Sequence, residues 1–572
     1  MFNESAHMDI QKDRQLLRGA KERGRLATLR AYMKLSGPGW LQSAITLGGG
    51  SLASSLYLGV LAGFSLMWLQ PLAMILGIVM LSAIAYVTLS TGERPFRAIN
   101  QHVNPVLAWG WVIATMMANL VWSMPQFALG TAAVQQNLLK NIVGPEAMPE
   151  PWGKTIVAAA ILIVCVVVVL LYNSGSWGVK LFGIIIKLMV GIIVVCFFGV
   201  VVKMTVAGVL DWGRILRGLV PDFRLLVAPA KTFEPFIAAV DSKYQAFWTN
   251  LIVGHQRDVM ISAASSAVGI NMTFMLPYSM LRRRWGREFR GLAIFDLSTG
   301  LFIPFILATG CVVIASAAQF HTRPAAGFLG ETDKSGVLIQ PAQNLVGKYK
   351  SITEARVRYK VGSDAFATLK DEEKATLIDA LPTADKRLAA MLIKRDAFNL
   401  AQSLSPLTGQ TFAHYVFGIG VVGMAVSSII VLMLINGFVF CEMQGIESKG
   451  WSYRVGSLAP CIGVLGPFIW TGGKAQFWLA VPTSMFAMVL LPIAYFAFYL
   501  LMNQRSLLGD SMPRGAKRVT WNILMAIAAG LASFGCIWTL WSKFRWIGIS
   551  LIVAFVALAL FVHFIRSAKQ RP

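Results

Sequence analysis

Long apolar stretches separated by short polar segments dominate the chain. Most of them approach or exceed the roughly 20 residues that a helix needs to cross the hydrocarbon core of a bilayer. This pattern predicts an all-α integral membrane protein with about twelve transmembrane helices. The expected spans are residues 40–63, 66–90, 105–133, 154–172, 177–202, 259–281, 291–317, 410–441, 455–471, 476–501, 519–541 and 545–566.

Positive charge is concentrated in four of the polar segments. They are the N-terminal tail 1–36, the loops after the sixth and tenth spans, and the C-terminus. With about twelve spans, all four fall on one side of the membrane, which the positive-inside rule identifies as the cytoplasm. We therefore expect both termini to be cytoplasmic, in the inner or plasma membrane of a bacterium.

Two long segments then face outward, residues 211–258 and 318–409. The second carries charges of both signs. An apolar pattern at Leu377, Ile378, Leu381 and Leu388 predicts that it is a small helical insertion. Such an insertion could bind a partner or simply shield the mouth of the protein.

Composition supports the membrane interpretation. The chain is 56% hydrophobic and only 14% charged, which excludes an ordinary soluble domain. A net charge of +24 could indicate nucleic-acid binding, but the basic residues lie between apolar runs, so lipid is the expected partner. Six cysteines without a CxxC pair predict neither a disulfide framework nor a zinc site. No motif predicts an enzyme or a resident cofactor, and the oligomeric state stays open.

The first span contains residues that a continuous helix would not favour. Thr46 is followed by the run Gly48, Gly49, Gly50 and then Ser51. Consecutive glycines are costly in a helix and expose backbone amides that lipid cannot satisfy. The run predicts an unwound segment lining a cavity. The alternative is a close glycine-mediated contact between two helices.

A second interruption lies in the sixth span, at Gly269, Asn271, Met272 and Thr273, ahead of Pro277. An ordinary kinked helix is the alternative here. Interruptions in the first and sixth spans are where inverted five-helix repeats place their discontinuous helices. The predicted organisation is a first repeat at 37–210, a second at 259–501, and two further helices within 502–572.

Several short motifs agree with this organisation. Gly37-Pro38-Gly39 precedes the first break, and Gly218-Leu219-Val220-Pro221 precedes the sixth span. Ser405-Pro406-Leu407 opens the eighth span, and Leu491-Pro492 followed by Leu507-Leu508-Gly509 belongs to the tenth. In this order the chain resembles Nramp-type (natural resistance-associated macrophage protein-like) divalent-metal transporters. The resemblance implies the LeuT-type fold of the amino-acid/polyamine/cation superfamily and transport by alternating access.

The metal ligands of that family are missing. The family holds a dication with Asp-Pro-Gly-Asn in helix one, and this chain has Gly48 to Ser51 there. At the family's Met-Pro-His segment of helix six, Asn271 and Thr273 fall near the Met and His positions. Leu490 replaces a helper glutamine, and Met124 and Phe127 lie near the acidic positions of helix three. Since dications need carboxylate or soft ligands, we expect no metal site of the usual kind. Asn271 and Met272 remain the alternative ligands.

A basic residue stands in the fifth span instead. Lys187 is about ten residues into it, roughly 15 Å at 1.5 Å per residue, which places it near the midplane. The stretch resembles helix five of transporters in which a lysine replaces a coupling sodium, so Lys187 is a candidate for coupling to H⁺ or Na⁺. The alternative is a lysine paired with backbone carbonyls. Further cavity candidates are Gln42, Ser43, Asn119, Gln126, Ser427 and Ser428.

These observations lead to three hypotheses for the function of the protein. Glycines beside a half-helix N-terminus and a buried lysine favour a secondary transporter for a small anion or carboxylate-bearing solute, for example bicarbonate. The first alternative is a divalent-metal transporter with an altered site. The second is a receptor or scaffold that keeps the fold without transport, which predicts a centre filled with side chains.

Overall fold

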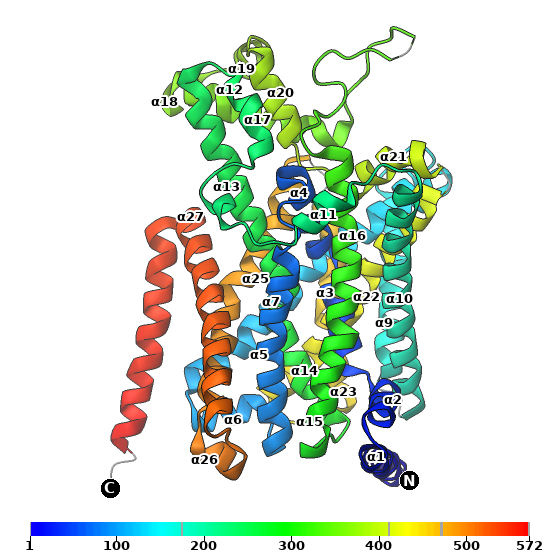
Figure 1. The fold of residues 1–572 in the computed structure, drawn as a ribbon, viewed down its shortest axis with the longest axis vertical. Helices are drawn as coiled ribbons and strands as arrows, with labels where there is room; N and C mark the ends of the chain where they lie inside the picture. The colour runs from blue at the N-terminus through cyan, green and yellow to red at the C-terminus, as the bar shows by residue number, and fades with distance from the viewer. Residues whose placement is uncertain (1, 173–175, 334, 410–411, 470–472, 570–572) are drawn as a thin grey trace.

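The structure is a computed structural model that describes residues 2–172, 176–333, 335–409, 412–469 and 473–569. The elements named in these ranges are α-, 3₁₀- and π-helices, with no β-strand among them. This confirms the all-α prediction. The long helices run roughly parallel in one bundle, with both chain termini at the same end (Figure 1).

Eight helical segments of the described residues are long and apolar enough to cross a membrane, or up to ten if two bent pairs are each one span. The prediction of about twelve differs from these counts for two structural reasons. The first is the last helix, α27 (Ala516–Lys569), which has non-helical φ and ψ at Arg545 and folds into two neighbouring halves (Figure 1). The main long helices are α5 (Leu69–Thr91), α7 (Pro105–Ala133), α9 (Trp152–Tyr172), α10 (Ser176–Val206), α16 (Ile303–Phe320), α22 (Phe417–Met443) and α25 (Gly473–Met502).

The second reason is the expected ninth span, 455–471, which is not one continuous helix. Its described residues form α23 (Gly450–Leu458), a 3₁₀ segment (Ala459–Leu465) and α24 (Gly466–Ile469). Prolines inside the segment remove helical donors. Its glycines also approach α7 closely, since a Cβ on Gly466 would lie 2.2 Å from the carbonyl oxygen of Met124. Tight packing against α7 therefore replaces a regular helix.

The segment expected as an outward loop, 211–258, is partly helical. Helix α13 (Ser242–Ala267) begins well before residue 259 and includes the aromatic stretch from Tyr244 to Trp248. It follows the short helices α11 (Trp212–Arg217) and α12 (Glu234–Ala238). The start of this helix was not predicted, because its first turns contain polar residues and the spans were predicted from apolar runs.

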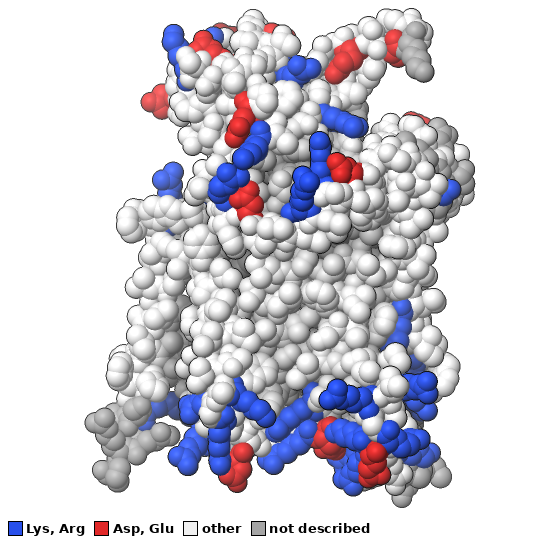
Figure 2. All heavy atoms as spheres, viewed as in Figure 1, with Lys and Arg blue, Asp and Glu red and all other residues white. Residues whose placement is uncertain are grey.

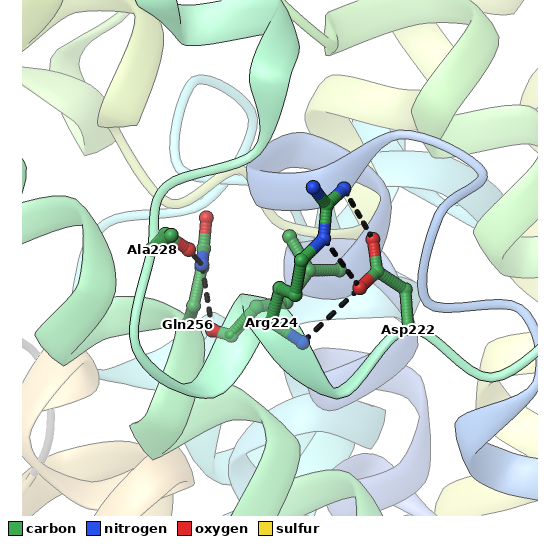
Figure 3. A network of polar contacts seen from close by, with 5 residues as sticks. Asp222, Arg224, Ala228 and Gln256 are labelled. Carbon is green, nitrogen blue, oxygen red and sulfur yellow. Dashed lines mark hydrogen bonds and ion pairs between the residues drawn. The ribbon is translucent and has the colours of Figure 1, made fainter.

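Gln256 of α13 fastens the preceding loop to the bundle (Figure 3). Its side chain is fully buried and donates to the carbonyls of Leu225 and Ala228, at 2.8 and 2.9 Å, and accepts from the amide of Ala230 at 2.9 Å. An ion pair between Asp222 and Arg224 closes the turn beside it. One buried side-chain amide therefore satisfies three backbone groups that would otherwise lack a hydrogen-bond partner.

The insertion 318–409 is helical from residue 343 on, as predicted, whereas the described residues between 321 and 342 are irregular. Val357, Phe366, Ile378 and Leu381 form a small apolar cluster of their own within it. Its helices lie mainly at the end opposite the termini, which we call the outer end (Figure 1). They are α17 (Gln343–Val361), α18 (Ser363–Thr368), α19 (Asp371–Asp379), α20 (Thr383–Leu392) and α21 (Ala397–Thr408). The apolar pattern at Leu377, Ile378, Leu381 and Leu388 is divided between two helices, α19 and α20, with Leu381 in the connection between them. The motif Ser405-Pro406-Leu407 lies inside α21 and not in the long helix that follows.

Charge separates the two ends of the molecule. On the face shown in Figure 2, Lys and Arg gather at the end where both termini lie, and the outer end carries both signs. Between them the surface is almost entirely uncharged. The basic tail forms α1 (Phe2–Glu22) and α2 (Arg25–Leu35) at the basic end.

Candidate functional site

The first break lies between α3 (Pro38–Thr46) and α4 (Gly49–Ala62), whose axes differ by 56°. Only Leu47 and Gly48 leave the helical conformation, so the break is shorter than the predicted unwound run from Gly48 to Ser51. A Cβ on Gly48 would lie 2.5 Å from Oγ of Ser428 on α22. Glycine is needed at this position because another helix approaches the break.

The backbone amides at this break are partly occupied. The amide of Gly48 donates to Oγ of Ser51 at 3.1 Å, and the amide of Gly49 donates to Oε1 of Gln126 at 2.9 Å. Ser51 also donates to the carbonyl of Gly48 at 2.8 Å. The protein's own side chains therefore already fill part of the amide cradle expected from the sequence.

The second break separates α13 from α14 (Ile270–Arg282) at Val268 and Gly269. Asn271 stands just after it and is 1% exposed. Its Oδ1 accepts from the amide of Met272 at 2.9 Å, which fixes the orientation of the side-chain amide. Its Nδ2 has no hydrogen-bond partner among the described residues. A buried donor is thus left for an acceptor that the protein does not supply.

The two breaks touch each other. Thr46, the last residue of α3, donates its hydroxyl to the sulfur of Met272 at 3.1 Å. Gln42, one turn earlier, donates to the carbonyl of Met272 at 3.4 Å. Residues more than two hundred positions apart in the sequence therefore meet at one point inside the bundle.

A cavity of about 240 Å³ opens at these breaks and extends toward the outer end. Of the residues singled out from the sequence, the ones that line it are Thr46, Gly48, Gly49, Gly50, Ser51, Gln126, Gly269, Asn271, Met272 and Ser428. The fold therefore brings together most of the candidate residues, from the five helices α3, α4, α7, α14 and α22.

Five cavity candidates lie outside the lining. One of them, Ser43, donates its hydroxyl to the carbonyl of Gly300 at 2.6 Å. Thr273 turns to α7, where its Oγ1 accepts from the indole of Trp111 at 2.9 Å. Asn119 contacts Asn436, and Ser427 donates to the carbonyl of Ala44 at 3.0 Å. Gln42 is committed to Met272. Each of these makes a helix–helix contact, the bland role that polar residues commonly have inside a membrane.

Lys187 does not line the cavity at the breaks. Its ammonium donates to the carbonyl of Ser36 at 2.8 Å, just before α3 begins. Ser36 is ten residues from Thr46, so this contact is roughly 15 Å along the chain from the break. The lysine stem is long enough to reach a carbonyl where a chain enters a helix. Lys187 therefore corresponds to the alternative of pairing with backbone.

The start of α3 is also held by Asp296. Asp296 is 1% exposed and accepts from the hydroxyl of Ser36 and from the amides of Gly37 and Gly39, at 3.1 and 2.7 Å. This carboxylate caps the helix, so it is not a ligand of the cavity.

Charged residues at the outer part of the cavity escaped the sequence analysis. Lys348, Lys394, Arg395 and Asp396 line it, and all four come from the insertion. Nothing in the local sequence distinguishes them from surface charges. No group of three or more His, Cys, Asp or Glu side chains that could hold a metal ion exists among the described residues.

Comparison with known proteins places these features in a family. The family model for natural resistance-associated macrophage protein-like (Nramp) sequences matches residues 39–345 and 386–542. The match leaves out the middle of the insertion. No curated protein matches the sequence significantly.

Solved structures show the same fold. A manganese transporter of Eremococcus coleocola, in complex with an aromatic bis-isothiourea substituted compound, superposes with a TM-score of 0.62 at 13% identity, covering 94% of each chain. A histidine-to-alanine mutant of that transporter also gives 0.62 at 13% identity, covering 94% of this chain and 95% of that one. At this identity the likeness concerns the fold alone.

Proposed function

Because the chain belongs to the Nramp family of membrane transporters, we propose that it is a secondary transporter whose cargo is a small anion or carboxylate-bearing solute such as bicarbonate. The cargo would bind at the two broken helices and move by alternating access. One observation carries the choice of cargo. The cavity offers a buried donor at the breaks, Nδ2 of Asn271, and among the described residues its one lining carboxylate, Asp396, belongs to the insertion.

The electrostatics of the whole cavity point in the same direction. Three cationic side chains and one carboxylate line it among the described residues, a net charge of +2 when all are ionised. A dication entering such a cavity would be repelled. Water screens charges strongly, whereas charges in a poorly solvated site are screened only weakly. An anion would be attracted, and its oxygen atoms could accept from Asn271.

Uptake of labelled bicarbonate into proteoliposomes tests the proposal. Asn271→Leu removes the buried donor, and Gly49→Val adds side-chain atoms where a Cβ already lies 3.0 Å from Leu129 and 3.2 Å from Gln126. Asn271→Leu should reduce uptake about tenfold or more, because it removes a charge-assisted hydrogen bond to the anion. Gly49→Val should reduce uptake to a similar extent, because its added atoms would crowd the cavity. Gly191→Val is the matched control, since nothing lies within 4 Å of its Cβ. Undiminished uptake in both cavity variants would refute the proposal.

A second candidate is transport of a divalent metal, as in the manganese transporter that shares the fold. The sulfur of Met272 and Oδ1 of Asn271 are the ligands such a cargo would use, and both lie at the second break. We expect no uptake of Mn²⁺ or Mg²⁺, because among the described residues the cavity has one carboxylate, Asp396 of the insertion, against three cations. Saturable Mn²⁺ uptake that Met272→Ala weakens would favour this candidate over the anion.

The receptor or scaffold alternative predicted a filled centre, whereas a cavity lies between the breaks. This observation favours transport.

We further propose that the basic end, which carries both termini, faces the cytoplasm of a bacterium, following the positive-inside rule. Coupling to H⁺ or Na⁺ is part of the same proposal. Bicarbonate uptake under an imposed gradient of either ion identifies which one drives it.

A further inference from the structure

The insertion reaches into the transport cavity. Lys348 is on α17, while Lys394, Arg395 and Asp396 lie in the short connection between α20 and α21. We call these four residues the outer vestibule. They line the same cavity as Gly49, Asn271 and the other residues of the breaks. A solute that enters from the outer end therefore passes them before it reaches the breaks.

The three cations of the outer vestibule are buried. Lys348, Lys394 and Arg395 are 8, 6 and 4% exposed. The ammonium of Lys348 donates to the carbonyl of Lys394 at 3.0 Å, and the ammonium of Lys394 lies 5.5 Å from the centre of the Tyr57 ring. These contacts place both lysines on one wall, since the backbone of one holds the side chain of the other.

Arg395 has a different role from the two lysines. Its guanidinium donates to the carbonyls of Ala390, Met391, Ile393 and Arg323. It therefore fixes the backbone of the connection while its charge adds to the positive potential. The two lysines line the cavity together with Arg395.

The nearby carboxylates have structural contacts of their own. Asp396 caps α21 by accepting from the amide of Asn399 at 3.1 Å, and it also accepts from Asn344 at 2.6 Å. Asp258 of α13 is paired with Lys543 at 2.9 Å. Burying several like charges together is costly unless an opposite charge joins them. An anion in the cavity would add to the negative charge near these cations.

We propose that Lys348 and Lys394 form an anion-binding site in the outer vestibule, with Arg395 behind them, that takes a small carboxylate or a carbonate-type anion. Binding there is a property of the vestibule alone. Its role as the entrance to the breaks rests on the proposed function. The middle of the insertion, which carries Lys348, lies outside the match to the family model.

Proton binding is linked to this site. Burial, and then the charge of Lys348, lower the pKa of Lys394 to about 7, while Asp258 opposes the shift. The other groups facing it are Tyr57 of α4, hydrogen-bonded to His255 of α13, and the adjacent Arg395 and Asp396. Below this pKa Lys394 is charged and attracts an anion, and above it the charge is lost. Anion affinity should therefore fall as the pH rises through about 7. Bound anion should in turn promote proton uptake.

Titration calorimetry of the full-length protein in detergent tests the site, with sodium acetate as the probe at about pH 6 and about pH 8. Lys348→Gln and Lys394→Gln should each weaken acetate binding about tenfold at the lower pH. Lys360→Gln, an exposed lysine farther along α17, is the matched control and should bind like the unmodified protein. Lys394→Arg keeps the charge but not the titration, so it should bind acetate equally at both pH values.

The outcomes separate the two proposals. Acetate binding that is unaffected by both glutamine variants, or no acetate binding at all, overturns the vestibule site. If uptake needs Asn271 but binding does not need the lysines, only the vestibule proposal fails. If the lysine variants weaken acetate binding while the unmodified protein takes up no anion, the vestibule site stands and the proposed function fails. Retained binding by Lys394→Arg excludes misfolding as the cause of a loss in Lys394→Gln.

Discussion

At the residue scale, the three consecutive glycines Gly48, Gly49 and Gly50 have different structural roles. Gly48 is in the break and faces Oγ of Ser428, whereas Gly49 and Gly50 already belong to α4. The two explanations considered from the sequence, an unwound segment and close helix packing, both hold at Gly48. The backbone breaks there, and α22 approaches at the same point.

Gly48→Ala should therefore destabilise the protein by about 1–3 kcal/mol, the usual cost of overpacking a tight site. The added Cβ would lie 2.5 Å from Oγ of Ser428 and no closer than 3.3 Å to its next neighbour. Removing that oxygen in the double variant Gly48→Ala/Ser428→Ala should restore most of the loss, as measured by thermal unfolding in detergent. A double variant no more stable than Gly48→Ala would show that backbone conformation, and not the contact, requires glycine.

At the element scale, the insertion is attached to α13 by a buried polar cluster. Arg356 of α17 and Asp385 of α20 form an ion pair at 2.7 Å, with each side chain 1% exposed. Asp385 also accepts from the indole of Trp248 at 2.7 Å, and Arg356 stacks over the ring of Tyr244 at 3.4 Å. The aromatic residues Tyr244 and Trp248 at the start of α13 therefore contact the insertion directly.

Asp385→Ala should cost about 3–5 kcal/mol in the stability of the insertion, because it leaves Arg356 buried without its partner. The double variant Asp385→Ala/Arg356→Met should recover much of this. Asp371→Ala breaks an exposed pair with Lys374 on the same insertion and should change little. Limited proteolysis of residues 343–392 reports the effect. Equal protection in all three variants would mean that the apolar cluster alone holds the insertion.

At the scale of the whole molecule, the cavity extends to the outer end. The first residues of α3, which lie away from the break, are held in place by side-chain contacts. Asp296 caps the first residues of α3, and Lys187 holds the carbonyl of Ser36. Alternating access requires that one half of a broken helix can move while the other stays packed. Under the alternating access proposed above, α3 is the half whose contacts have to be released for the basic end to open.

Asp296→Ala removes the acceptor of two amides and one hydroxyl, so α3 should loosen. Hydrogen–deuterium exchange of residues 37–46 should rise about tenfold or more, corresponding to roughly 1.4 kcal/mol of local stability. The second half, α4, is the internal control and should keep its protection. Exchange that rises equally in both halves would indicate general destabilisation and contradict a local release of α3.

The sequence by itself determined the class of the protein, the helical bundle, and the two places where helices break. Apolar runs of membrane-spanning length can only be helices in lipid, and glycines interrupt them for local backbone reasons. The family was also predictable, because its motifs Gly37-Pro38-Gly39 and Gly218 to Pro221 are local. The absence of carboxylates at the breaks was likewise visible from residue types alone.

Only the tertiary structure decided which side chains share the cavity. Thr273 and Lys187 have the right residue type and register but turn to Trp111 and Ser36. Lys348 and Lys394 have no local signal, yet the docking of the insertion on α13 buries them at the cavity mouth. The sequence pattern determines where a helix must break, because a break depends on residues that are neighbours in the chain. Which charges line the resulting cavity depends on contacts between segments far apart in the chain.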